Sequence, residues 1–273
     1  MTRYRLRTFG LELTMIAVTA LFAFPIYVLL NLSFRQRGDL GAPLVPTTSP
    51  TLANYGDAWT EAQLGPAILN SAIVTVVSVT VLVLVGSMAA YALARATSRL
   101  SKGVFALVMV GLLLPFQLGL IPLYLTVRDL GLLGSVWSLA LFYSGLQVPL
   151  TVFLYVGFIR ALPRDFEEAA LLDGSGPWQA FRHVVFPLLR PITGTVIIIN
   201  TVFIWNDFLT PLLYLSGSTQ QTIPVAIYGF VGQYITRWEF VFAGLVIGIA
   251  PVLAAYFLMQ KHVIRGFAGG LKG

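Results

Sequence analysis

The chain has 273 residues, of which 57% are hydrophobic and only 10% are charged, and its formal net charge is +6. A soluble domain carries roughly 25% charged residues, so this composition excludes an ordinary water-soluble protein. The chain has no cysteine, which excludes a disulfide framework, a thiol nucleophile and a thiolate metal site.

Six apolar stretches are long enough to cross a membrane, because a helical span needs about 20 residues. They lie at about 13–34, 67–94, 104–127, 136–159, 192–215 and 239–260. Arginines precede the first, as in a signal peptide, but its apolar run is too long and no small-residue cleavage site follows. We expect it to be retained. The sequence therefore predicts an all-α membrane protein with six transmembrane helices.

The basic residues predict how these spans are oriented. With cytoplasmic termini, only Arg35, Arg37, Arg128 and Arg237 of the 17 lysines and arginines lie outside. The other basic residues fall in segments 1–12, 95–103, 160–191 and 261–273. Since lysine and arginine concentrate on the cytoplasmic side, we expect a multi-pass membrane protein with both termini in the cytoplasm. This distribution explains the net positive charge without requiring that the protein binds a nucleic acid.

The segments between the spans differ in character. Residues 35–66 form a first external loop rich in proline, glycine and threonine, for which we expect little regular structure. Residues 216–238 form a second external loop. Within the second and sixth spans, Gly86 and Gly244 each belong to a face of small residues, which permits close helix packing. The halves show no inverted repeat, which counts against a self-contained secondary carrier.

The cytoplasmic loop at 160–191 predicts two short helices. Asp165 is positioned to cap the first, with Glu168 completing a capping box, and Gly174 is suited to end it. Pro177 opens the second helix and Pro187 is expected to end it. One face of this second helix carries the apolar side chains of Trp178, Phe181 and Val185.

A longer pattern in this loop carries a family resemblance. The letters EAALLDG at 168–174, followed by Phe181, Pro187-Leu188 and Pro191, resemble the signature loop of permeases in binding-protein-dependent ABC importers. A capped turn lying in the lipid interface is the alternative, but it does not account for the later positions. The resemblance implies a type I ABC importer permease fold and a loop that docks on an ATPase subunit. The docking role would fall to Glu168, Ala169, Ala170, Asp173, Gly174 and Pro187.

Other segments are similar to sugar importers of the maltose type, in particular to the shorter, six-helix subunit. They are TLANY at 51–55, Asn70-Ser71, IPLY at 121–124, WNDFLTPLLYL at 205–215 and the glycine-rich end from Arg265. The resemblance implies three partners: a second permease, a dimer of ATP-binding subunits and an external sugar-binding protein. The ATPase would bind ATP and Mg²⁺, and this chain would need no cofactor. It has no Walker A pattern, and we expect no catalytic or metal site in it.

The resemblance also suggests how the chain is organised. An N-terminal helix and first external loop would cover 1–66. The core permease domain would cover 67–265, with the coupling loop at 160–191. A cytoplasmic tail would follow at 266–273, and its contact with the ATPase is an expectation from the family.

Polar residues inside the spans are candidates for a sugar pathway. They are Gln117, Gln147, Asn200, Asn206 and Asp207. Hydrogen bonding between helices is the alternative for each. An unpaired carboxylate in a span is costly, so Asp207 should face protein or water; it can equally cap a broken helix. In the second external loop, Thr219, Gln220 and Gln221 are candidates for contact with the binding protein, and a purely structural cover is the alternative.

Two functional alternatives stay open. The same architecture can import glycerol phosphate or a polyol, although no span contains lysine or arginine well inside, which favours a neutral sugar. An ATP-independent channel or carrier would not need the cytoplasmic loop.

The predicted orientation can be tested with one cysteine, since the native chain has none. A cysteine at Ser218 should react with an impermeant maleimide added from outside, because residues 216–238 are predicted to be external. Labelling only from the cytoplasmic side would refute this topology.

Overall fold

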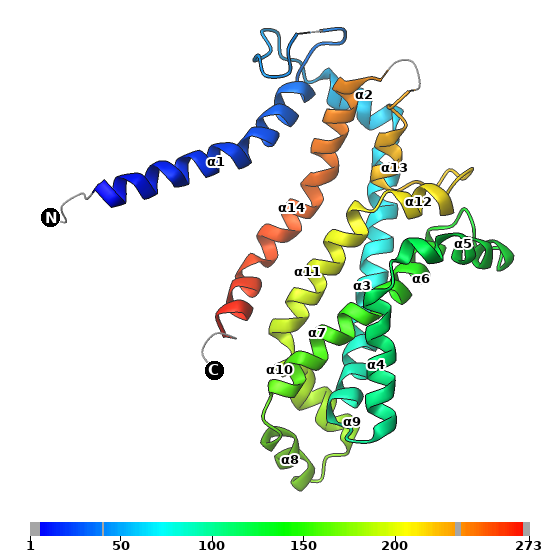
Figure 1. Cartoon of the computed structure of the whole chain (residues 1–273). Helices are drawn as coiled ribbons and strands as arrows, with labels where there is room; N and C mark the ends of the chain where they lie inside the picture. Colours follow the sequence, from blue (N-terminus) through cyan, green and yellow to red (C-terminus); the bar gives the residue numbers. More distant parts are fainter. Residues whose placement is uncertain (1–5, 40, 233–235, 270–273) are drawn as a thin grey trace. The chain divides into compact units, whose positions relative to one another are not determined.

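The computed structural model (Figure 1) describes residues 6–39, 41–232 and 236–269. The chain divides into two compact units. Unit 1 comprises Met1–Gly65 and Ala226–Pro251, and unit 2 comprises Pro66–Val225 and Val252–Gly273. Within the described residues the regular elements are helices, and strand-like pairing is limited to the isolated bridge between Val231 and Thr236. Of the basic residues counted above, Arg3, Arg5 and Lys272 lie outside the described residues, as do residues 270–273 of the predicted tail.

The described helices account for six membrane spans when each bent pair counts as one. Three are long, apolar helices: α1 (Leu6–Ser33), α3 (Leu64–Arg95) and α14 (Trp238–Gly269). Three are bent pairs: α4 (Arg99–Leu113) with η1 (Phe116–Gly119) and α5 (Leu120–Asp129), α6 (Val136–Leu146) with α7 (Val148–Ala161), and Pro177–Leu188 with α11 (Arg190–Asn206). The predicted all-α architecture is confirmed, and the predicted six spans are reached when each bent pair counts as one.

Three predicted spans are not continuous helices. The span expected at 136–159 bends by 42° between α6 and α7. The span expected at 104–127 bends by 91° between α4 and the helical segment that follows it. Leu114 and Pro115 are extended there, because a proline ring disfavours helical geometry in the preceding residue and supplies no N–H. The span expected at 192–215 is interrupted at Asp207, which is also extended, and resumes as α12 (Leu209–Tyr214).

The segment predicted to be the first external loop is more ordered than its composition suggests. It contains a helix, α2 (Ala53–Glu61), within the range expected to lack regular structure. The Asn54 side chain is buried and its amide donates to the carbonyl oxygens of Ser33 and Arg35, at 2.9 and 2.7 Å. Ala58 is fully buried. Tertiary contacts therefore stabilise a short helix that proline and glycine content alone does not predict.

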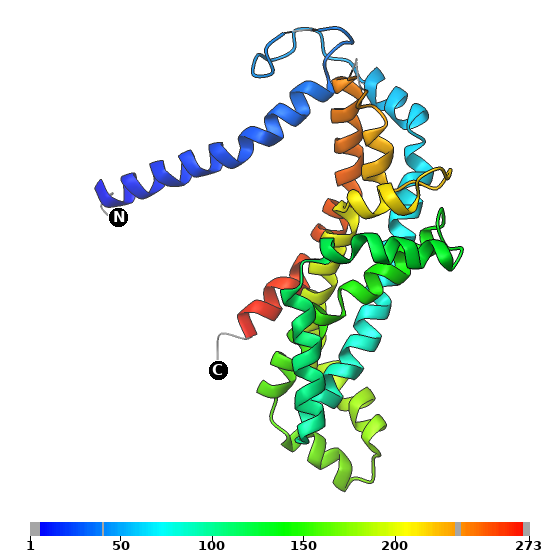
Figure 2. The ribbon, with the colours of Figure 1, turned by 45° about the vertical axis from the view of Figure 1, so that its right-hand side comes forward.

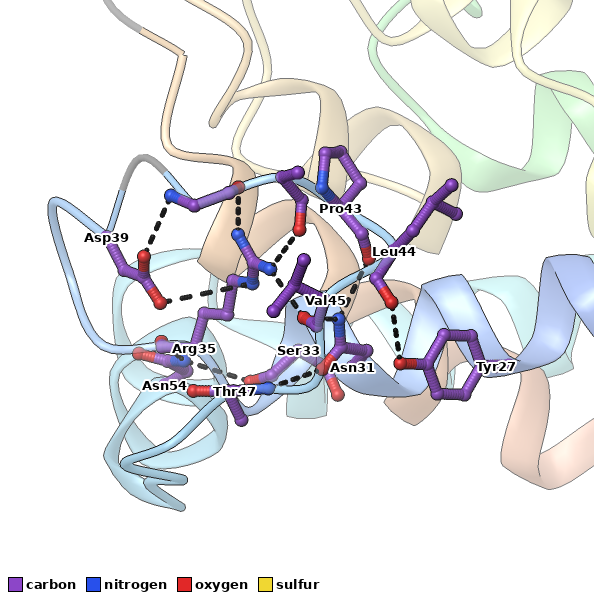
Figure 3. Close-up of polar contacts among 12 residues, drawn as sticks. Tyr27, Asn31, Ser33, Arg35, Asp39, Pro43, Leu44, Val45, Thr47 and Asn54 are labelled. Carbon is purple, nitrogen blue, oxygen red and sulfur yellow. Dashed lines mark hydrogen bonds and ion pairs between the residues drawn. The ribbon is translucent and has the colours of Figure 1, made fainter.

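In the irregular part of the same loop, polar side chains donate hydrogen bonds to several backbone carbonyls (Figure 3). Arg35 is buried, and its guanidinium donates to the carbonyls of Gly41, Ala42 and Val45. The Asn31 amide donates to the carbonyls of Pro43 and Val45, at 2.8 and 3.0 Å. Because these carbonyls have no helix or sheet partner, side-chain donors replace the missing backbone bonds.

A second cluster in unit 1 holds the end of the other external loop. Arg237 forms an ion pair with Glu61 of α2, with 2.5 Å between Nη2 and Oε2. Its guanidinium also lies over the rings of Phe230 and Phe240, at 5.0 and 4.6 Å from their centroids. An arginine can combine an ion pair with ring stacking in this way because its guanidinium is planar and weakly hydrated.

Unit 2 has two hydrophobic clusters. One joins α3 to α6 and α12, and includes Leu139, Tyr143 and Tyr214. The other joins α3 and α7 to the segment after Pro177, and includes Tyr155 and Phe181. Figures 1 and 2 show the segment from α8 (Asp165–Leu172) to α9 (Pro177–Ala180) at one end of this unit, with α5 and α12 toward the other end.

Close approach of α3 and α7 depends on Gly86. A Cβ atom at this buried position would lie 2.5 Å from Cγ2 of Thr151, which is itself fully buried. Ala90, one turn later, is also fully buried. The small-residue face predicted on the second span therefore packs within the chain.

We expect Gly86→Ala to destabilise the chain despite alanine's better helix propensity. The added methyl group must displace the side chain of Thr151, and overpacking of this kind costs about 1–3 kcal/mol. The matched control is Gly157→Ala in α7, where a Cβ meets nothing within 4 Å. Thermal unfolding in detergent would measure both, and an unfolding temperature for Gly86→Ala at or above that of Gly157→Ala would contradict the prediction.

Candidate functional site

The loop between α7 and α11 begins with α8, whose start differs from the sequence prediction. The helix starts at Asp165, with Arg164 at the N-cap, and no side chain caps it. The N–H groups of Glu167 and Glu168 both bond to the carbonyl of Arg164. The predicted capping box between Asp165 and Glu168 is therefore wrong, because Asp165 already has a place in the first helical turn. Its negative charge still stabilises the helix N-terminus.

The end of α8 is as predicted. Gly174 has a positive φ of 86°, in the left-handed region that favours glycine. Its N–H bonds to the carbonyl of Leu171, and the N–H of Ser175 bonds to the carbonyl of Ala170. This pair of bonds is the Schellman motif, which satisfies carbonyls at a helix end.

The second helix of the loop starts at Pro177, as predicted, but Pro187 does not end it. α9 continues through a π-helical turn at Phe181–Val185, labelled η2, into α10 (Phe186–Leu188). In this turn the N–H of Phe186 bonds to the carbonyl of Phe181, five residues back. The wider turn accommodates the proline ring, which would clash in a regular helix. The bend of 73° follows Leu188.

The predicted docking residues lie mostly on the surface of α8 and its turn. Glu168, Ala169, Asp173 and Gly174 are exposed, whereas Ala170 is half-buried and Pro187 is half-buried in α10. The same helix exposes three large apolar side chains, those of Phe166, Leu171 and Leu172. Leu172 is 88% exposed. α8 thus presents small, acidic and apolar groups that no other part of the described chain covers.

Glu167 was not among the predicted site residues. This residue is buried, and its carboxylate accepts hydrogen bonds from Arg95 and Tyr91 at the end of α3. The two glutamates of the doublet therefore differ: Glu167 turns inward and Glu168 faces outward. An arginine that ends an apolar span at Arg95 was the available signal, because a half-buried cation needs a partner.

Three of the five polar residues predicted for the pathway lie near the seam between α6–α7 and α11: Gln147, Asn200 and Asp207. Asn200 is fully buried, and its amide donates to the hydroxyl of Thr151 at 3.3 Å and to the carbonyl of Val196 at 2.8 Å. Gln147 is buried at the break between α6 and α7, one turn before Thr151. These contacts fit the alternative of hydrogen bonding between helices.

Asp207 has a defined structural role. Its Oδ2 accepts a hydrogen bond of 2.7 Å from the hydroxyl of Tyr143, and its Oδ1 accepts one of 3.2 Å from the N–H of Leu209. The carboxylate thus accepts the first N–H of α12, whose N-cap is Phe208, and ties this helix to α6. This agrees with the alternative that Asp207 stabilises the start of a broken helix. Gln117 and Asn206 are exposed, and the Asn206 amide donates to the carbonyl of Val202. These two residues are not brought into the buried seam.

The tip of the second external loop is attached to the starts of α3 and α6. The Gln220 side chain accepts a hydrogen bond of 2.8 Å from the N–H of Val136. Asn70 donates to the carbonyl of Gln221 at 3.0 Å, and Ser71 accepts from the N–H of Ile223. Thr219 and Gln221 keep exposed side chains. Gln220 therefore holds the tip in place, and Thr219 and Gln221 are available for a partner.

The described side chains do not bring three histidine, aspartate or glutamate residues together as a metal site. The features assembled in unit 2 are instead those of a transport protein: bent spans, a buried polar seam and an exposed helix at one end.

Comparison with known families gives this class a name. The sequence profile described as "Binding-protein-dependent transport system inner membrane component" matches residues 82–269, which is more than half of the chain. The chain belongs to this family of bacterial membrane transport permeases.

Several relatives match over most of their own length. The melibiose/raffinose/stachyose import permease protein MelC of Bacillus subtilis is 38% identical over 248 residues, covering 90% of each chain. The multiple sugar-binding transport system permease protein MsmG of Streptococcus mutans is 35% identical, covering 92% of this chain and 91% of its own. The probable starch degradation products transport system permease protein AmyC of Thermoanaerobacterium thermosulfurigenes is 33% identical, covering 98% and 96%.

The fold also matches a solved structure. A chain from the crystal structure of a bacterial ABC transporter involved in the import of the acidic polysaccharide alginate superposes with a TM-score of 0.80. The match covers 96% of this chain and 99% of the other, with 21% sequence identity. It confirms the type I ABC importer permease fold that the loop resemblance predicted.

Proposed function

We propose that this chain is one permease subunit of an ATP-driven importer for a neutral sugar or oligosaccharide. The observation that carries the proposal is agreement among relatives of nearly full length, each of which is named as a permease for sugars or starch products. The spans contain no lysine or arginine well inside, which suits an uncharged solute. A second permease would complete the path, and an external sugar-binding protein would deliver the solute.

The geometry of α8 supports coupling to an ATPase subunit. An exposed, two-turn helix with small residues and a rigid Schellman end offers a low-profile surface that fits a groove. The exposed apolar side chains of Leu171 and Leu172 can bury against a partner, and Glu168 and Asp173 can form charge-assisted hydrogen bonds there. In this proposal ATP and Mg²⁺ are bound by the ATPase dimer, and this chain needs no cofactor and catalyses no reaction.

The proposed orientation follows from the same assignment. If α8 meets a cytoplasmic ATPase, both termini are cytoplasmic and the segments at 35–66 and 216–238 are external. The excess of basic residues near α8 and near both chain ends supports this arrangement. The division into 1–66, 67–265 and 266–273, and the contact of the tail with the ATPase, belong to the proposal as well.

The proposed transport is tested by reconstitution. The chain should be co-expressed with its genomic neighbours that encode a second permease, an ATPase and a binding protein, and placed in proteoliposomes. ATP-dependent uptake of radiolabelled raffinose or maltotriose is expected. Uptake of radiolabelled sn-glycerol 3-phosphate and of sorbitol is measured in parallel. Uptake of glycerol phosphate or sorbitol instead of any sugar would support the alternative solute classes. Uptake without ATP would indicate a channel or carrier.

Gly174→Asp should abolish coupling. The turn needs φ of 86° at this residue, and a β-carbon there strains the Schellman motif next to the proposed docking face. We expect lost uptake and weaker co-purification of the ATPase, with membrane insertion unchanged. Gly103→Asp, on an exposed part of α4 with a negative φ, is the matched control. Normal uptake by Gly174→Asp would contradict the assignment of this loop.

Two sets of point variants test the role of the second loop, residues 216–238. Thr219→Ala with Gln221→Ala removes two exposed side chains but keeps both backbone anchors of the tip. Gln220→Ala removes the hydrogen bond to Val136. If the loop contacts the binding protein, the first pair should lower the rate of uptake in the assembled importer. Unchanged uptake for that pair, with a defect only for Gln220→Ala, would show that the loop is structural.

A further inference from the structure

A half-buried ion pair joins α8 to the end of α3. The Arg95 guanidinium donates to Oε1 of Glu167 through Nη2 at 2.6 Å and through Nε at 2.9 Å. The Tyr91 hydroxyl donates to Oε2 of the same carboxylate at 3.1 Å. The Arg95 and Glu167 side chains are only 15% and 12% exposed. Three donors thus fix both carboxylate oxygens, which determines the position and the rotation of α8 relative to α3.

The same arginine reaches a third helix. Its Nη2 also donates to the carbonyl of Leu162, the residue that caps the end of α7, at 3.3 Å. The guanidinium therefore connects the ends of α3 and α7 to the start of α8. It also supplies a donor for a carbonyl at a helix end, where the helix itself has none.

Aromatic rings attach the second helix of the loop to this point. The ring of Phe181 lies 5.2 Å from that of Tyr91, and the ring of Trp178 lies 5.6 Å from that of Phe181. Phe181 is buried, whereas Trp178 is largely exposed. Both helices of the loop are consequently held at the end of α3, one by charge and one by ring packing.

This ion pair differs from the other one described in unit 2. Arg128 and Asp129 are neighbours in sequence on α5, and their side chains are 55% and 67% exposed. Such a surface pair connects no helices and is screened by solvent. The Arg95–Glu167 pair joins residues 72 apart in the sequence, within a partly desolvated site.

We propose that Arg95 and Glu167, supported by Tyr91, are positioning residues that transmit movement of the ATPase-docked α8 to α3. The inference rests on the proposed function, because it needs an ATPase on the outer face of α8. Glu168 faces that outer side and Glu167, its neighbour, faces inward. A push on α8 is then passed to α3 and α7 through the pair. Without it, a helix of eight residues has too little stability of its own to act as a rigid lever.

The test uses the reconstituted importer with its ATPase, second permease and binding protein. Glu167→Gln and Arg95→Gln each remove one charge, and Tyr91→Phe removes one hydrogen bond while keeping the ring that packs on Phe181. Arg128→Gln is the matched control, since it breaks the exposed pair. The quantities measured are ATPase co-purification, stimulation of ATP hydrolysis by the loaded binding protein, and ATP hydrolysed per raffinose imported.

Each charge variant is expected to retain the ATPase but to lose stimulation by at least fivefold and to hydrolyse several times more ATP per sugar. Tyr91→Phe should shift both quantities in the same direction by less, and Arg128→Gln should leave them unchanged. The double variant Arg95→Gln with Glu167→Gln should be no worse than either single variant, because both act through one contact.

The result that overturns the inference is normal stimulation and normal ATP per sugar in assembled Glu167→Gln and Tyr91→Phe complexes, even if the amount of complex falls. That pattern would show a role in folding alone. If Glu167→Gln does not assemble, the Tyr91→Phe result decides. Failure of the wild-type chain to bind the ATPase is a different outcome, since it refutes the proposed function itself.

Discussion

Breaks in the spans of unit 2 depend on replacing backbone hydrogen bonds that lipid cannot supply. At the interruption after α11, Asp207 provides the replacement by accepting the N–H of Leu209. The carboxylate is itself held by Tyr143 of α6, so the break in one span is fixed by a side chain of another. At the interruption after α4, Pro115 has no N–H to satisfy. Irregular backbone is therefore tolerated in two ways. A proline has no N–H that needs a partner, and a side chain such as that of Asp207 can accept an N–H that the helix leaves free.

The two faces of α8 are specialised by adjacent residues. Glu167 is tied to Arg95 and Tyr91, and the opposite side of the helix exposes Glu168 and Leu172. If α8 docks on an ATPase as proposed, it must be both available to its partner and rigidly connected to the spans, because a loosely attached helix would absorb movement without passing it on. The inward ion pair and the Schellman end at Gly174 meet the second requirement while leaving the outer face uncovered.

In unit 1, side chains also supply hydrogen bonds to backbone that is neither helix nor strand. The segment after α1 has few helical or strand bonds of its own, and its carbonyls are satisfied by the buried side chains of Arg35 and Asn31. Asn54 adds the start of α2 to the same network. A long proline-rich segment can thus be ordered without regular structure.

The sequence by itself determined the class of protein, the number of apolar stretches long enough to span and the two-helix loop at 160–191. Apolar run length, the EAALLDG pattern, Gly174 and Pro177 are local signals, and local geometry follows from them directly. The tertiary structure alone decided that Glu167 turns inward, that Asp207 bonds to Tyr143, and that Gln220 holds a loop tip. It also corrected the capping box at Asp165 and the helix end at Pro187. The physical reason is that a polar residue's role depends on the partner within reach. Residues 72 or 64 positions apart become partners only when the helices pack.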